Sequence, residues 1–90
     1  MRPENRMMQE YLKAHGIHAR ARYEWRGSLK GTWRLYNYNQ RWSMALAAEL
    51  EALGFRDFDG KRFNQCSGNG GEFSVFVRGH QEMISGVTPP

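Results

Sequence analysis

The sequence predicts a small α+β domain in which an antiparallel sheet of three to four strands carries two helices on one face. Residues 17–26 alternate apolar and polar side chains. This alternation is typical of a strand that has one side on a core and the other side toward water. Residues 42–53 repeat apolar side chains at helical spacing, and residues 73–78 alternate again. Because 90 residues are too few for two cores, both helices must pack on the same sheet face. The expected order is α-β-β-α-(β)-β, within a single domain of residues 1–80.

The first helix is expected over residues 4–15. Pro3 and Glu4 suit its start, because a missing amide hydrogen costs little there and a carboxylate meets the positive end of the helix dipole. Gly16 supplies the end of the helix. Its apolar face repeats at Met8, Tyr11, Leu12 and His15.

Residues 17–26 and 32–38 are expected to form a hairpin that is closed by the loop 27–31. Symmetrical closure predicts five cross-strand pairs: Trp25 with Trp33 and Tyr23 with Leu35 on the inner side, and Glu24 with Arg34, Arg22 with Tyr36 and Arg20 with Tyr38 on the outer side. Each pair would contribute a few tenths to about 1 kcal/mol. A slip by one residue would turn the charged row inward.

The second helix is expected to follow Asn39, whose side chain can cap it, and to end at Gly54. Phe55 is expected to fold back on the last turn, as in a Schellman motif. The apolar stripe of this helix consists of Trp42, Ala45, Leu46, Leu50 and Leu53.

The rest of the chain is expected to form turns around one more strand. Residues 59–60 are an Asp-Gly turn signal. The glycine-rich residues 67–71 could cradle a phosphate, but they precede a strand rather than a helix, which favours a plain hairpin turn. Residues 81–90 have little apolar content and end in two prolines, so we expect a loosely ordered tail.

The positive charge is concentrated in one part of the chain. Residues 17–42 contain six basic residues and one acidic residue, a surplus of five, whereas the whole chain has a net charge of +4. The remaining residues therefore sum to minus one. This distribution predicts attraction to a polyanion or to an acidic protein surface.

The outer face of the hairpin is the candidate binding surface, because it mixes guanidinium groups with exposed rings. That combination is typical of proteins that hold single-stranded nucleic acid, with charge following the phosphates and rings stacking on bases. In the alternative interpretation these residues pair with one another and keep the sheet soluble, and Glu24 within the row favours it. The candidate residues are Arg20, Arg22, Arg34, Tyr36, Tyr38 and Arg78, with Phe76 if the last strand pairs alongside.

We expect no enzyme, metal or cofactor. His15 and His18 straddle the expected end of the first helix, and the third histidine, His80, is far away in the sequence, whereas a metal site needs three or four ligands. Cys66 has no histidine or aspartate at a spacing typical of a catalytic pair. Residues 57–60 resemble the opening of a calcium loop, but basic and aromatic residues follow where oxygen ligands are needed.

The single cysteine excludes an intramolecular disulfide and indicates a reducing compartment. The N-terminal residues do not resemble a signal peptide, and no apolar run approaches the roughly 20 residues that cross a bilayer. We expect a cytoplasmic location and no membrane contact. The sequence leaves the oligomeric state open.

Several short motifs lie between residues 32 and 80. They are Thr32-Trp33-Arg34-Leu35-Tyr36, Trp42 with the Leu-rich helix, Leu53-Gly54-Phe55, Asp57-Phe58-Asp59-Gly60, and Ser67-Gly68-Asn69-Gly70-Gly71 leading into Phe73-Ser74-Val75-Phe76-Val77-Arg78-Gly79. Over residues 32–80 they resemble small uncharacterised proteins of bacterial phages and integrative mobile elements. The resemblance implies no activity and transfers no functional residue. It implies an accessory protein that binds nucleic acid or, alternatively, a protein-binding factor or inhibitor of host machinery, as anti-CRISPR proteins are.

Overall fold

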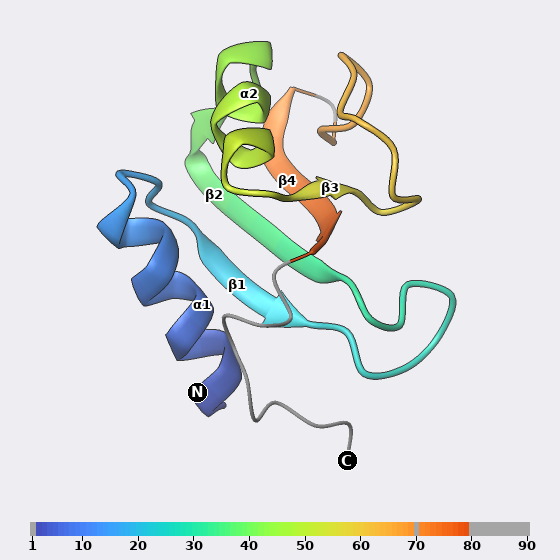
Figure 1. Ribbon diagram of the computed structural model, residues 1–90. Helices are drawn as coiled ribbons and strands as arrows, with labels where there is room; N and C mark the ends of the chain where they lie inside the picture. The colour runs from blue at the N-terminus through green and yellow to red at the C-terminus, as the bar shows by residue number, and fades with distance from the viewer. Residues whose placement is uncertain (1, 70, 80–90) are drawn as a thin grey trace.

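The computed structural model describes residues 2–69 and 71–79 and confirms the expected fold class (Figure 1). The elements in chain order are α1 (Pro3–Ala14), β1 (Arg20–Tyr23), β2 (Trp33–Arg41), α2 (Met44–Ala52), β3 (Arg56–Asp57) and β4 (Glu72–Arg78). The strands form one antiparallel sheet in the order β1-β2-β4-β3. The tail expected over residues 81–90 lies outside the described residues.

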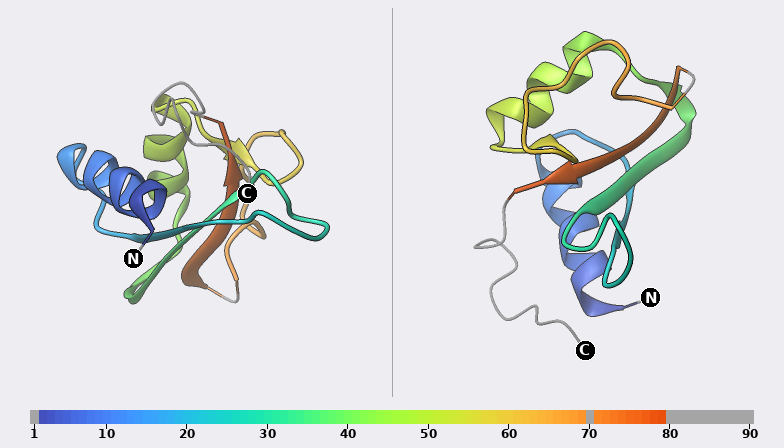
Figure 2. Two further views of the ribbon diagram at one scale, coloured as in Figure 1. Left: turned by 90° about the horizontal axis from the view of Figure 1, so that it is seen from below. Right: turned by 90° about the vertical axis from the view of Figure 1, so that its right-hand side faces the viewer.

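Both helices pack on the inner face of the sheet (Figures 1 and 2). Alternate residues of β2 and β4 supply this face, because successive side chains of a strand point to opposite sides. Within the described ranges, fourteen buried apolar residues form one cluster. It includes Met8 and Leu12 of α1, Leu46 and Leu50 of α2, and Trp33, Leu35, Phe73, Val75 and Val77 of the sheet. The opposite, outer face of the sheet carries the candidate binding residues.

Helix α1 also covers the free edge of the sheet at β1. The backbone amides of Ala21 and Tyr23 point away from β2 and donate to the side-chain oxygens of Gln9 and Asn5, each at 3.0 Å. Four residues rise about 6 Å along a helix, and two residues span about 6.8 Å along a strand. The two side-chain amides therefore match two successive edge amides of the strand.

The hairpin register differs from the expected one by two residues. Observed partners are Arg20 with Tyr36, Ala21 with Leu35, Arg22 with Arg34 and Tyr23 with Trp33. The ladder closes where the Glu24 amide donates to the Thr32 carbonyl and the Gly31 amide donates to the Glu24 carbonyl, both at 2.9 Å. The loop is therefore longer than expected, and Trp25 leaves the ladder. Because the side-chain period is two, this shift preserves the inner and outer faces.

The prediction that Asn39 caps the second helix is wrong. Strand β2 continues through Asn39 to Arg41, which pairs with Glu72 of β4 after an irregularity in the ladder. The helix begins after Ser43 instead, whose Oγ accepts a hydrogen bond from the Leu46 amide at 3.1 Å. Trp42 therefore precedes the helix rather than belonging to its stripe.

The end of α2 is confirmed as a Schellman motif. The Phe55 amide donates to the Leu50 carbonyl at 3.0 Å, and the Gly54 amide donates to the Glu51 carbonyl at 2.9 Å. Gly54 has a φ of 100°, which a glycine adopts without steric penalty. Phe55 is fully buried, so the motif also anchors the chain that leads into β3.

A single glycine lets the loop before β4 lie directly on an aromatic ring. A Cβ atom at Gly68 would lie 2.3 Å from Cγ of Trp42, closer than any side chain permits. The Trp42 ring packs in turn on Phe63 and Phe73, with centroids 5.5 and 6.1 Å away. The loop is thus held against the core at Gly68 by a close approach.

Candidate nucleic-acid interface

Five of the six candidate residues gather on the outer face of β1 and β2. Arg20 lies opposite Tyr36, Arg22 lies opposite Arg34, and Tyr38 continues the same side of β2. We call this surface the arginine–tyrosine face and define it as Arg20, Arg22, Arg34, Tyr36 and Tyr38. Its most exposed ring is Tyr38, at 67%.

The side chains along β2 touch one another in a row. The guanidinium carbon of Arg34 lies 4.7 Å from the centroid of the Tyr36 ring. The Tyr36 and Tyr38 rings are 5.3 Å apart between centroids, and Nη2 of Arg34 lies 3.5 Å from Oη of Tyr38. This packing restrains a cation and two rings side by side at the surface.

The arginine–tyrosine face keeps its positive charge. Glu24 was expected to lie opposite Arg34, but it pairs instead with Arg22, with Nε and Oε1 3.5 Å apart. The Arg22 side chain is 62% exposed, and a pair so exposed contributes little. Within the described part of the chain, neither Arg20 nor Arg34 has a carboxylate partner. Two like charges therefore lie directly opposite each other at Arg22 and Arg34.

A hollow of about 620 Å³ adjoins the arginine–tyrosine face, between α1 and strands β1 and β2. Tyr36 and Tyr38 line it together with Arg6, Lys13 and Arg20, whose three positive charges outnumber the one negative charge of Glu10. Sequence reasoning missed Arg6 and Lys13, because their contribution depends on how α1 docks. The sequence does contain one signal for this arrangement. Arg6 and Lys13 are seven residues apart, so both lie on one polar face of the expected helix.

Arg78 does not join the other candidates. It ends β4 beside the start of β2, because its neighbour Val77 pairs with Trp33, whereas Tyr38 lies toward the other end of β2. Its Nε donates to the carbonyl of Phe58, so this guanidinium holds a loop in place. Phe76 does extend the face as expected, because β4 pairs with β2 and places Phe76 opposite Arg34.

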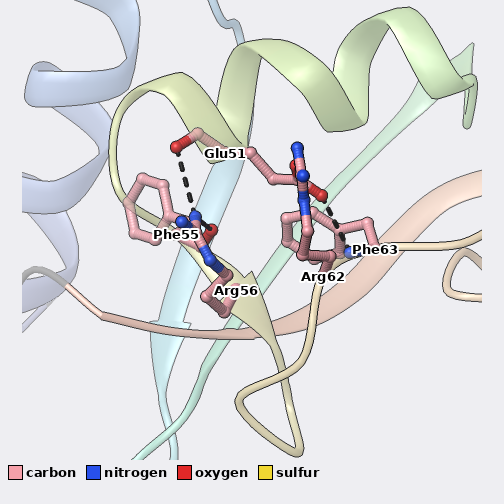
Figure 3. Close-up of polar contacts among 5 residues, drawn as sticks. All are labelled: Glu51, Phe55, Arg56, Arg62 and Phe63. Carbon is pink, nitrogen blue, oxygen red and sulfur yellow. Dashed lines mark hydrogen bonds and ion pairs between the residues drawn. The ribbon is translucent and has the colours of Figure 1, made fainter.

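Glu51 joins the end of α2 to the segment that follows β3, as Figure 3 shows. Its Oε1 accepts hydrogen bonds from Nε and Nη2 of Arg62 at 2.9 and 2.8 Å, and its Oε2 accepts from the Phe63 amide at 2.9 Å. The Glu51 carbonyl accepts from Nη1 of Arg56 at 3.2 Å. The Arg62 hydrogen bonds, then the Phe63 amide, lower the pKa of the Glu51 carboxyl. Sequence reasoning did not single out this glutamate.

No group of three or more His, Cys, Asp or Glu side chains within residues 2–69 and 71–79 could hold a metal ion. Neither helix of that part of the chain has the length and apolar character to cross a membrane.

Comparison with protein-family models, curated proteins and solved structures finds no match to this chain. The fold and the candidate site together define a small α+β protein with a basic, aromatic sheet surface.

Proposed function

We propose that this protein is a non-enzymatic binding module that holds single-stranded nucleic acid on the arginine–tyrosine face. The observation that best supports the proposal is the contact between Arg34 and Tyr36, with the Tyr38 ring next to them. The row places a cation beside two stacking surfaces, and the described residues give Arg34 no carboxylate that would neutralise it.

The two kinds of side chain would divide the work of binding. Phosphates of the strand would lie on Arg20, Arg22 and Arg34, with Arg6 and Lys13 along the adjoining hollow. Bases would stack on Tyr36 and Tyr38, at about 1 to 3 kcal/mol each. A duplex hides its base faces, so we expect it to bind more weakly than a single strand.

A salt titration with a fluorescein-labelled single-stranded DNA 12-mer, read by anisotropy, tests the proposal. Each neutralised phosphate should contribute about −0.7 to the slope of log affinity against log salt. We expect Arg20→Gln and Arg34→Gln each to weaken binding and to flatten this slope. The matched control is Lys61→Gln, which removes one exposed charge from the turn after β3. Absence of binding to single- or double-stranded DNA or RNA at low salt would reject the proposal.

Capture experiments with a host lysate test the alternative of an acidic protein partner. Suppose that the wild type captures a host protein but binds no nucleic acid, and that exchange of Arg20, Arg22 and Arg34 for Glu abolishes this capture. That result would favour an accessory factor or inhibitor of host machinery. The mobile-element origin, the cytoplasmic location and the absence of enzymatic activity stay predictions.

A further inference from the structure

A second hollow of about 570 Å³ lies on the outer face of the sheet, beside the arginine–tyrosine face. Arg34, Ser74 and Phe76 line it from the strands. Leu29 of the hairpin loop, Phe58, and residues 66–69 line it from the surrounding loops. Its volume falls in the range of sites for small ligands, and it combines apolar side chains with a few polar groups.

The lining suits a planar, partly polar group. Two rings border the hollow: Phe76 is half-buried in the sheet, and Phe58 is 48% exposed. Ser74 and Asn69 add groups that can donate or accept hydrogen bonds. A base offers both a flat face for the rings and an edge with donors and acceptors.

The charges of the hollow disfavour a phosphate inside it. Asp57 lines it and is only 7% exposed. Its Oδ1 accepts from the Phe58 amide at 2.8 Å, and its Oδ2 accepts from Oγ of Ser67 at 2.7 Å. Both oxygens therefore have a protein donor, and the negative charge of this side chain beside the hollow repels an anion. Among the described residues that line it, Arg34 is the one cation.

The hollow is continuous with the proposed path of the strand. Arg34 lines it and also stacks on Tyr36, which lines the hollow beside α1. Part of its wall is tied down, because Arg78 binds the Phe58 carbonyl and Asp57 accepts from the Phe58 amide and from Oγ of Ser67. A site held by such supporting contacts loses little freedom on binding.

We propose that this hollow takes one unstacked nucleobase of a single strand whose phosphates lie on the arginine–tyrosine face. This inference rests on the proposed function. The strand would pass over Tyr38 and Tyr36, place a phosphate on Arg34, and turn the next base toward Phe76 and Phe58.

Affinity of the labelled 12-mer for Phe58→Ala gives the first readout. We expect a loss of about fivefold or more, since one stacking ring is removed. The slope of log affinity against log salt should stay that of the wild type, because no charge is removed. Met44→Ala is the matched control: Met44 is a large apolar side chain that is 44% exposed at the start of α2, away from both hollows. It should bind as the wild type does.

Cys66 gives the second readout, because it is the single cysteine of the chain, is exposed, and lines the hollow. We expect saturating 12-mer to slow its alkylation by iodoacetamide in the wild type, and to slow it less in Phe58→Ala. This inference would be overturned if the wild type binds the oligonucleotide normally while Cys66 stays unprotected and Phe58→Ala keeps full affinity. The proposed function would then still stand. Failure of the wild type to bind any oligonucleotide would overturn both.

Discussion

Arg22 and Arg34 are direct cross-strand partners on the outer face of the β1–β2 hairpin. Like charges in this position destabilise a sheet by up to about 1 kcal/mol. We therefore expect Arg22→Gln to raise the free energy of unfolding by a few tenths of a kcal/mol at low salt and to weaken oligonucleotide binding. Urea denaturation at low and high salt measures the first effect, which screening should remove. Arg6→Gln is the control, because it also removes one positive charge but Arg6 has no like-charged cross-strand partner. Equal stabilisation by both variants would contradict repulsion between Arg22 and Arg34 as the cause.

Loss of the Gln9 side chain should loosen the sheet edge at one amide. We expect Gln9→Ala to lower the free energy of unfolding by about 0.5 to 1.5 kcal/mol, because the Ala21 amide loses its acceptor. Hydrogen exchange should accelerate at Ala21 more than at Tyr23, which keeps Asn5. Glu10→Ala, an exposed neighbour on α1, should leave both amides protected. Unchanged exchange at Ala21 in Gln9→Ala would show that the edge is covered by other means.

Two substitutions distinguish the caps of α2. Ser43→Ala should lower the free energy of unfolding by about 1 kcal/mol, because the Leu46 amide loses its side-chain acceptor. Asn39→Ala should change it by less than about 0.5 kcal/mol, since Asn39 is exposed on β2. Thermal unfolding followed by circular dichroism measures both. A larger effect at Asn39 than at Ser43 would contradict the observed start of the helix.

Cavities in the core should destabilise the domain strongly. We expect Trp33→Ala to cost about 3 to 5 kcal/mol and Leu46→Ala about 2 to 5 kcal/mol, because both side chains belong to the buried cluster. Either loss is comparable with the whole stability of a small domain. Tyr38→Ala, on the outer face, should melt close to the wild type. Wild-type melting of both core variants would contradict the assignment of the inner face.

Acid should weaken the contact that Glu51 makes. Its pKa is lowered from 4.5 in the folded protein, chiefly by the Arg62 hydrogen bonds, so its contribution to stability is present above that value and is lost as the pH falls below it. Stability should therefore drop less steeply in Glu51→Gln than in the wild type between about pH 6 and pH 3. Glu49→Gln, exposed on the same helix, should follow the wild type. Parallel curves for all three proteins would contradict a role for the ionised Glu51 carboxyl.

Periodicity alone was enough to predict the fold class and the two faces of the hairpin. It could not predict the register, because a shift of two residues leaves the alternation of residues 17–26 unchanged. Loop geometry decides that register: Gly31 has a φ of 87°, and Trp25 packs on the Tyr23 ring at 4.4 Å instead of facing Trp33.

The limits of local signals are also clear at α2 and in the candidate site. Asn39 and Ser43 can both cap a helix, and the choice depends on how far β2 pairs with β4, a long-range contact. The arginine–tyrosine face was predictable because its residues alternate within one hairpin. Arg6 and Lys13 reach it only through the docking of α1. The Arg78 guanidinium binds the Phe58 carbonyl, a contact between residues 20 apart in the chain that no local pattern predicts.

The position of α1 ahead of β1 has a consequence for synthesis. The ribosome releases Asn5 and Gln9 before the strand that they cover. The side chains that bind the edge amides of β1 are therefore synthesised before those amides are. A chain shortened by its first helix would present bare amides at Ala21 and Tyr23 to other copies. Such a truncated chain should aggregate during expression. The N-terminal helix would then protect the chain from self-association by covering this sheet edge.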